Sequence, residues 1–446
     1  MGRIAVQMIE MKSMSSKSFY NFLVPLAISS VMLLSSTPLV AGTTNASEKV
    51  TTYRGWSIPQ YVKPDPNLAT LRHYFLKDYE LVNDSSLGHY RIEPAGNSER
   101  LKIKTEKNEY LSQQMNQSGL LSYILYDGDG IKYDEISPKN RLGDLYTNKT
   151  QYLSNSVGKS FVSYLVGHAI CEGYISGLDA VVDDWPLIKG TLYDGQPLID
   201  LLNMNAGDAR YVDDADGLVE TGRWYNTHNI KTFAETELAN SKPIPKKSRK
   251  HHYNGLATNV VLNYAIHKMN YEIQPFLKSI FQDKVKIQHQ ATMRYNIFAR
   301  DNNGRMTATK VPIEHGAAIY TFYLSRYDYL RVALAMLNDW KTDNCVGKYL
   351  KSLVERKIPQ KRFMEKEKGY RFSARSYAGQ FHMDYLGLEG RNILSMDGYG
   401  GQHLMIDFDA SRIIAISTVH TNYDYSSLVL DAMKTGIIKE KKGNWN

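Results

Sequence analysis

The sequence has few cysteines and none of the common patterns that bind metals. Its 446 residues include only two cysteines, Cys171 and Cys345, and neither belongs to a Cys-x-x-Cys pair. The His-Glu-x-x-His pattern of zinc hydrolases is also missing. Residues 127–135 (DGDGIKYDE) resemble a calcium loop, but Ile131 stands where the third ligand belongs. We therefore expect neither a metal nor an organic cofactor.

The two cysteines leave two interpretations open. In an exported protein they could form a disulfide, because oxidising compartments favour that bond. Sequence alone does not place Cys171 and Cys345 within bonding distance. We expect two buried free thiols, with the disulfide as the alternative.

Positive charge is in excess but is not concentrated. The formal net charge is +8, and the one short basic cluster is KPIPKKSRKHH, residues 242–252. Proteins that bind nucleic acids usually gather lysine and arginine on one face. We therefore expect no nucleic acid partner. We interpret the cluster as a solvated loop, with attraction of an anionic substrate as the alternative.

Long apolar runs are missing except near the N-terminus. Residues 22–34 (FLVPLAISSVMLL) are too few for a comfortable membrane span and contain Pro25. Positive residues precede this run and small residues follow it. The pattern predicts a signal peptide over residues 1–41 and a periplasmic or secreted protein. An uncleaved anchor, which would give membrane association, is the alternative.

Strand patterns occur towards both ends of the chain, and helical patterns lie between them. LLSYILYDGDGIKYDEI predicts a hairpin, and HLMIDFDASRIIAISTVH predicts a strand, a turn and a strand. We expect an N-terminal extension over residues 42–115. We expect one α/β domain formed by residues 116–173 and 365–446, with a helical domain over residues 174–364 inserted in it.

The stretch YLSNSVGKSFVSYLVGHAI, residues 152–170, contains two possible signatures. Its GKS letters match the end of a phosphate-binding loop, but Leu153 stands where the first glycine of GxxxxGK[ST] belongs. The alternative is a serine nucleophile, Ser156, followed by Lys159 one helical turn later. Residues three apart share one helix face, so the two side chains can form a hydrogen bond. We favour the serine interpretation.

A serine at the start of a helix suits covalent catalysis. The backbone N–H groups and the helix dipole at that end favour a developing anion. A buried lysine near other cations loses proton affinity and can act as a base. The Ser-x-x-Lys pattern alone is common by chance, so the neighbouring segments decide the interpretation.

Those segments resemble a known family. SVGKSFVSYLVGHAICEGYISGLDAVVDDWP is similar to the nucleophile segment of serine β-lactamase-related hydrolases, and IDLLNMNAG, HYNGLATNVVLNYAI and DGYGGQHLMIDFDASRIIAIS resemble later segments in family order. The similarity spans residues 119–438 and is nearest to 6-aminohexanoate-oligomer hydrolases and esterases. It implies a β-lactamase/transpeptidase-like α/β (α+β) fold: an antiparallel sheet flanked by helices, plus an all-helical domain.

The resemblance also implies roles for single residues. Ser156 would be the acylated nucleophile, and Lys159 and Tyr253 would transfer protons. The backbone N–H groups of Ser156 and Gln402 would form the oxyanion hole. The substrate pocket would be lined by the triplet just before Gln402, which is Tyr399, Gly400 and Gly401.

Two departures from the family pattern bear on the substrate. The tyrosine motif usually reads Tyr-x-Asn or Tyr-x-Ser, and here Gly255 is third, with Asn254 at the wrong spacing to substitute. Tyr399 replaces a lysine or histidine that would suit a substrate carboxylate. We therefore expect an exported serine hydrolase acting on an ester or a small amide. A D-Ala-D-Ala peptidase or β-lactamase is one alternative, and a catalytically inactive ligand-binding relative is another.

Overall fold

The computed structural model describes residues 50–53, 56–59, 89–139, 146–213, 229–295, 298–300, 306–308, 311–360, 374–418 and 423–440. All of them belong to one compact unit, Glu48–Asn446. The predicted signal peptide, residues 1–41, lies outside the described residues. In the described part of the chain, no helix is long and apolar enough to cross a membrane.

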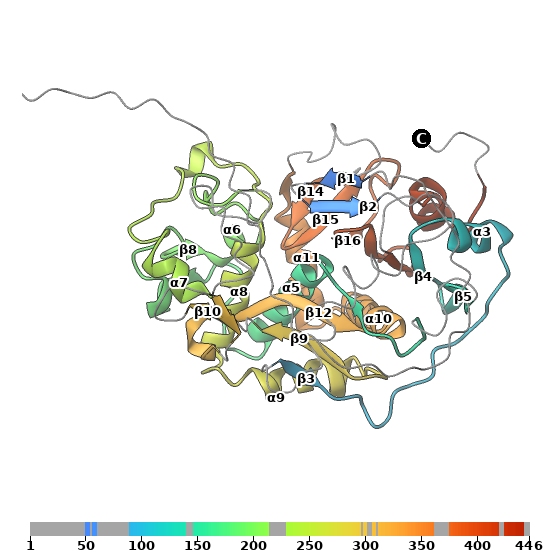
Figure 1. The fold of residues 1–446 in the computed structure, drawn as a ribbon, viewed down its shortest axis with the longest axis horizontal. Coiled ribbons are helices and arrows are strands. Elements are labelled where there is room, and N and C mark those ends of the chain that lie inside the picture. The colour runs from blue at the N-terminus through green and yellow to red at the C-terminus, as the bar shows by residue number, and fades with distance from the viewer. Residues whose placement is uncertain are drawn as a thin grey trace, which may run out of the picture. The chain divides into compact units, whose positions relative to one another are not determined.

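The main sheet is built from both ends of the chain (Figure 1). Its eight strands run antiparallel in the order β13-β14-β15-β16-β17-β18-β4-β5. The strands are β4 (Leu120–Asp127), β5 (Gly130–Ile136), β13 (Ile358–Pro359), β14 (Ala374–Ala378), β15 (Phe381–Tyr385), β16 (Ile393–Gly398), β17 (Gln402–Asp407) and β18 (Arg412–Thr418). Pairing of β4 with β18 confirms the predicted sheet. The β4–β5 turn confirms the predicted hairpin, with Gly128 at φ 69°.

Helices cover both faces of this sheet. The longer ones pack on one face, where α10 contacts β17 and β18 and α5 contacts β16 and β17. The opposite face is covered by α3 and by the C-terminal helical segments η8 and α12. These helices are α3 (Glu109–Gln117), α5 (Val157–Cys171), α10 (Arg326–Thr342), η8 (Ser426–Asp431) and α12 (Ala432–Thr435).

Strands also occur outside the main sheet. A second sheet has the order β3-β9-β12-β6, and its β6 leads directly into α5. Its strands are β3 (Tyr90–Ile92), β6 (Tyr152–Leu153), β9 (Ala291–Tyr295) and β12 (Ala318–Leu324). Three two-stranded pairs are β1 (Val50–Tyr53) with β2 (Trp56–Pro59), β7 (Val181–Val182) with β8 (Gln196–Pro197), and β10 (Phe298–Arg300) with β11 (Met306–Ala308).

Short and medium helices also occur in the insertion. Those in the described residues are η3 (Pro186–Ile188), α6 (Leu198–Leu202), α7 (Ile230–Glu235), η5 (Lys246–Ser248), α8 (Gly255–Lys268), α9 (Ile273–Leu277), η6 (Lys278–Lys284), η7 (Ile313–His315) and α11 (Cys345–Glu355). The middle of α8 is buried on every side, from Leu256 to Ile266. A helix buried all round lies in the core.

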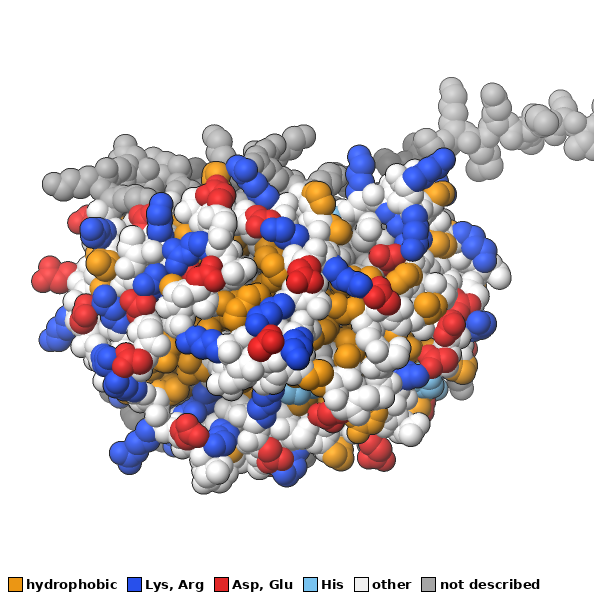
Figure 2. Space-filling view, turned by 180° about the vertical axis from the view of Figure 1, so that it is seen from behind, with side chains coloured by type: hydrophobic (Ala, Val, Ile, Leu, Met, Phe, Trp, Pro, Cys, Tyr) orange, Lys and Arg blue, Asp and Glu red, His pale blue; other side chains and the backbone are white. Residues whose placement is uncertain are grey.

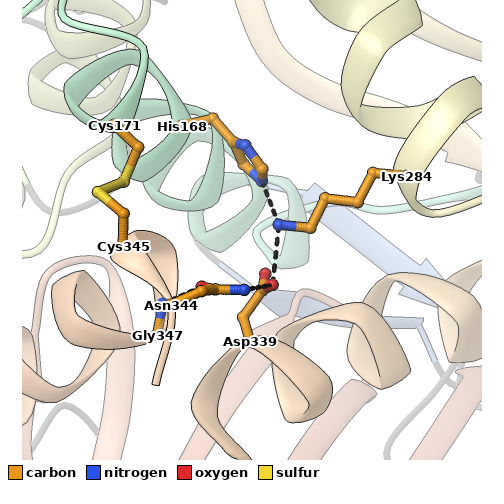
Figure 3. Close-up of a disulfide and its surroundings, with 7 residues drawn as sticks. All are labelled: His168, Cys171, Lys284, Asp339, Asn344, Cys345 and Gly347. Carbon is orange, nitrogen blue, oxygen red and sulfur yellow. Dashed lines mark hydrogen bonds and ion pairs between the residues drawn. A yellow bond between two sulfur atoms is a disulfide. The ribbon is translucent and has the colours of Figure 1, made fainter. Parts of the chain in front are cut away.

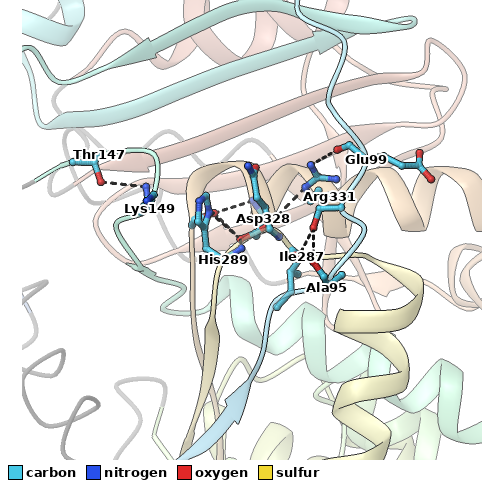
Figure 4. Close-up of polar contacts among 11 residues, drawn as sticks. Ala95, Glu99, Thr147, Lys149, Ile287, His289, Asp328 and Arg331 are labelled. Carbon is cyan, nitrogen blue, oxygen red and sulfur yellow. Dashed lines mark hydrogen bonds and ion pairs between the residues drawn. The ribbon is translucent and has the colours of Figure 1, made fainter.

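A buried carboxylate fixes the start of α10 (Figure 4). The Asp328 side chain accepts hydrogen bonds from the backbone N–H groups of Gln288 (2.6 Å) and His289 (3.0 Å). Arg331 lies 3.7 Å from the same carboxylate and donates to the carbonyl of Glu99. Asp328 therefore holds the loop before β9 against the helix that covers the main sheet.

Positive and negative side chains are interspersed on the surface. Figure 2 shows one face, on which Lys and Arg side chains lie among Asp and Glu side chains. Exposed pairs include Arg356 with Asp179 at 2.7 Å and Lys351 with Asp343 at 2.6 Å. This distribution agrees with the scattered charges of the sequence.

A disulfide joins Cys171 to Cys345 (Figure 3). The expectation of two free thiols is therefore wrong. Cys171 ends α5 and Cys345 begins α11, and the two helices pack where the Tyr349 ring meets Gly167. This packing brings the two Cα atoms to 5.8 Å although the cysteines are 174 positions apart, which sequence spacing does not reveal.

Next to the disulfide, the buried Asp339 forms a polar cluster. It accepts a hydrogen bond from the Tyr164 hydroxyl at 2.6 Å and one from Asn344 Nδ2 at 2.8 Å. Lys284 Nζ lies 2.8 Å from Asp339 Oδ1 and forms an ion pair with it. The cluster and the disulfide together fix the end of α5 that is remote from Ser156.

Removing the disulfide should destabilise the fold. We expect replacement of Cys171 and Cys345 by serine to lower the free energy of unfolding by about 2–4 kcal/mol, because the unfolded chain regains freedom. Urea denaturation measures this change. A reductant should shift the wild-type midpoint and leave that of the double variant unchanged. Equal midpoints for oxidised wild type and double variant would contradict the prediction.

Candidate active site

Ser156 lies at the N-terminus of α5, directly after the short strand β6. Ser154 forms backbone and side-chain hydrogen bonds to Phe322 of β12, at 2.8 and 2.9 Å. Asn155 then turns the chain in the left-handed region, with φ 46°. A Cβ at Gly158 would lie 1.9 Å from the Tyr320 carbonyl oxygen. The glycine of the GKS letters thus allows α5 to pack against β12.

Lys159 is buried and reaches the serine. Its side chain is only 1% exposed, and Nζ donates a hydrogen bond to Ser156 Oγ at 2.8 Å. The same nitrogen lies 4.0 Å from the centre of the Tyr320 ring and 4.9 Å from that of Tyr253. The structure therefore brings together Ser156, Lys159 and Tyr253, the three predicted catalytic residues.

The residues after Tyr253 begin α8. Asn254 is the N-cap: its Oδ1 accepts from Ala257 N at 2.9 Å, and its Nδ2 donates to Asp208 at 3.1 Å. A side chain engaged in capping is not available for a substrate. Gly255 is the first helical residue and has no side chain. Neither residue supplies the side-chain amide or hydroxyl that the family pattern carries at this point.

The predicted substrate-binding triplet forms the turn between β16 and β17. Gly400 and Gly401 have φ values of 85° and 92°, a region that disfavours residues with a Cβ. The Asn155 side chain donates to the carbonyl of Tyr399 at 2.9 Å. This bond places the turn beside the residue that precedes Ser156.

Gln402 follows the turn and pairs with Gly398 across the hairpin. Its side chain is buried and donates to the Thr418 carbonyl at 3.2 Å. It also borders a small cavity between α5 and the sheet, together with Ser154 and Val157. The side chain is therefore structural, and the role of its backbone N–H in an oxyanion hole stays a prediction.

Sequence reasoning missed an aromatic cluster around Tyr253. The His382 ring stacks on the Tyr253 ring at 5.8 Å and 28°. Tyr377 meets both rings edge-on, at 6.0 Å from Tyr253 and 5.1 Å from His382. His251 lies 4.7 Å from Tyr377. Only the fold brings these residues together, since His382 and Tyr377 come from β15 and β14.

Burial keeps both histidines of this cluster neutral near pH 7. It lowers the pKa of His382 to about 4, and the nearby Lys159 and His403 act in the same direction. It also lowers the pKa of His251 to about 3. The cluster that flanks Tyr253 is thus uncharged at physiological pH.

Gln380 connects the helices around the site. It turns the β14–β15 hairpin at φ 75°, and its carbonyl accepts from Ser160 Oγ on α5. Its side chain accepts from Thr258 of α8 at 2.8 Å and donates to the Leu202 carbonyl at 2.8 Å. One turn residue therefore fixes three helices relative to the sheet.

A second buried network lies under β16. Asp397 accepts hydrogen bonds from Ser395 (2.6 Å) and Tyr385, and His403 Nδ1 lies 2.7 Å from it. Burial alone would raise the pKa of Asp397, but His403, His382 and Ser395 outweigh it and lower the pKa to about 2. Asp397 is therefore ionised, and it anchors the strand that ends at the turn.

The positively charged residues of the basic cluster divide into one buried arginine and several exposed lysines. The Arg249 side chain donates to Gln196 at 2.9 Å and to Asp200 at 3.3 Å. Lys246, Lys247 and Lys250 are exposed. This agrees with a solvated loop anchored by one arginine.

The low pKa of His382 predicts a pH-dependent stability. An unfolded chain takes up the proton near pH 6.5, whereas the folded chain takes it up near pH 4. The unfolded state then binds more protons, so stability falls as the pH drops below 6.5. For His382 this loss is about 2 kcal/mol between pH 6.5 and 5.

Urea denaturation at pH 7 and at pH 5 tests this. Between the two pH values, we expect the free energy of unfolding of His382→Gln to fall by about 2 kcal/mol less than that of wild type. The control His315→Gln, at a partly exposed histidine, should behave as wild type does. An equal loss in wild type and His382→Gln would refute the prediction.

Comparison with solved structures identifies the fold. A putative 6-aminohexanoate-dimer hydrolase from Bacillus anthracis superposes with a TM-score of 0.55 and 13% identity, over 84% of this chain and 96% of that chain. A putative β-lactamase from Bacteroides dorei superposes with a TM-score of 0.51 and 16% identity, over 74% of this chain and 97% of that chain. A penicillin-binding protein from Bacillus halodurans superposes with a TM-score of 0.50 and 14% identity, over 73% of this chain and 100% of that chain.

Sequence comparison adds no relative. No protein-family model matches the chain, and no curated protein sequence matches it. The structural matches agree with the mixed helices and antiparallel sheet seen in the protein. The chain has the fold shared by serine β-lactamases and penicillin-binding proteins, as the sequence predicted.

Proposed function

We propose that the protein is a serine hydrolase that cleaves an ester or a small amide through an acyl-enzyme on Ser156. The observation that carries the proposal is the 2.8 Å contact between Lys159 Nζ and Ser156 Oγ. A lysine buried against aromatic rings and bonded to a serine at a helix start has no obvious structural purpose. It has the arrangement of a nucleophile and its base.

The chemistry follows from these positions. In its unprotonated form, Lys159 would accept the proton of Ser156 Oγ as that oxygen attacks the carbonyl carbon of the substrate. Tyr253 donates its phenolic proton to the leaving alcohol or amine and takes up a proton from Lys159, and the acyl group stays on Ser156. Lys159 then accepts a proton from the attacking water, the bond between the acyl carbon and Ser156 Oγ breaks, that proton passes to Ser156 Oγ, and the acid leaves. The backbone N–H groups of Ser156 and Gln402 would bind the developing oxyanion.

The site favours an uncharged substrate. Tyr399 occupies the turn where a cation would suit a carboxylate, and the histidines beside Tyr253 are neutral near pH 7. The Bacillus anthracis neighbour is described as a 6-aminohexanoate-dimer hydrolase. A linear amide is therefore a substrate class to test beside simple esters.

Export is part of the same proposal. The disulfide between Cys171 and Cys345 suits an oxidising compartment. The apolar run of residues 22–34 supplies a signal sequence or an anchor at the membrane. The expected partner is then a small-molecule substrate outside the cytoplasm. We expect no nucleic acid partner.

A peptidase or β-lactamase activity is the second candidate. It is supported by the neighbours described as a β-lactamase and a penicillin-binding protein. A chromogenic cephalosporin and p-nitrophenyl butyrate separate the two. We expect the ester to be hydrolysed at least about tenfold faster than the cephalosporin, because Tyr399 offers no cation for the cephalosporin carboxylate. Faster cephalosporin hydrolysis would support the second candidate instead.

Labelling by a fluorophosphonate tests for the nucleophile itself. We expect the probe to modify Ser156 in wild type, as mapped by peptide mass spectrometry, and to leave Ser156→Ala unlabelled. Ser163→Ala is the matched control, since Ser163 lies two turns along the same helix and bonds to Tyr349. Folded wild type that stays unlabelled would favour an inactive ligand-binding protein.

A further inference from the structure

His251 is a buried histidine whose ring nitrogens are unused. It is 5% exposed, and in the described part of the chain neither Nδ1 nor Nε2 has a hydrogen-bond partner. Buried polar atoms nearly always have partners, so a residue with two unpaired nitrogens needs an explanation. Leaving both nitrogens unpaired is costly, because each gives up a hydrogen bond to water when the protein folds.

The surroundings of His251 place it at the candidate active site. Its ring lies 4.7 Å from the Tyr377 ring and 6.3 Å from the Tyr253 ring. The Tyr253 ring in turn contacts Lys159, which is bonded to Ser156. The neighbouring His252 differs, because its Nε2 lies 2.7 Å from the Val212 carbonyl oxygen. The unpaired histidine is thus the one next to the catalytic tyrosine.

A neutral imidazole offers one donor and one acceptor. Its best partner is an uncharged group that also offers both, and a secondary amide does so through its N–H and its carbonyl. A carboxylate has only acceptors and prefers a cation. Contacts with the Tyr377 and Tyr253 rings hold the His251 ring, so its nitrogens would be oriented in advance for such a group.

We propose that His251 is a specificity-determining residue that forms a hydrogen bond to an amide of the substrate beside the scissile carbonyl. The substrate class is then an N-acylated compound, an ester or amide that carries an acylamino group. This inference rests on the proposed hydrolase function for the position of the scissile bond. The recognition of the amide by His251 can be measured without catalysis.

Two matched pairs of probes test the proposal. For binding, N-acetylglycinamide is compared with pentanamide by NMR of the protein labelled with ¹⁵N-histidine. The His251 signals are assigned from their loss in His251→Phe. We expect N-acetylglycinamide to shift these signals and pentanamide to leave them in place.

For turnover, p-nitrophenyl N-acetylglycinate is compared with p-nitrophenyl pentanoate. We expect His251→Phe to reduce the ratio of the two kcat/KM values about tenfold, as the loss of one hydrogen bond allows. Hydrolysis of the pentanoate should change little. His315→Phe serves as the control and should keep the wild-type ratio.

The outcomes separate the two proposals. The role of His251 would be overturned if His251→Phe lost kcat/KM equally on both esters, or if N-acetylglycinamide did not shift the His251 signals. His251 would then be a packing residue. Absence of all ester turnover and of Ser156 labelling would overturn the hydrolase function. In that case a His251 shift with N-acetylglycinamide would still establish the amide site.

Discussion

The bond between Lys159 and Ser156 is the interaction on which the rest of the site depends. A lysine that is 1% exposed needs a partner for its amine, and here the partners include one hydroxyl and two tyrosine rings. Burial of such a group is expensive unless it is paired. The fold therefore holds β12, with Tyr320, and the start of α8, after Tyr253, against the first turn of α5.

The position of α5 is fixed along its whole length. Near its start, Gly158 permits close contact with the Tyr320 carbonyl, and Ser160 bonds to the carbonyl of Gln380. At its end, Cys171 is tied to α11. A catalytic pair needs supports of this kind, because small displacements reduce the rate strongly. The helix thus carries Ser156, the proposed nucleophile, on a rigid scaffold.

Much of this arrangement could be predicted from the sequence, because its signals are local. The hairpin around Gly128 and the three-residue spacing of Ser156 and Lys159 follow from short patterns. The disulfide and the cluster of His251 with His382 could not be predicted, since they join segments that only the fold brings together. The sequence offered Asn254, at the wrong spacing, as a substitute for the missing motif residue, and the structure uses it as a helix cap. Capping residues and binding residues have the same side chains, so one sequence does not distinguish them.

The most direct measurement is the rate at which a fluorophosphonate labels Ser156 in wild type and in Lys159→Met, followed across pH. The account predicts that labelling of the variant is at least about 100-fold slower, as expected when a general base is lost. Circular dichroism should show that the variant is folded. A folded variant labelled within about threefold of the wild-type rate, with the same pH dependence, would contradict the claim that Lys159 activates Ser156.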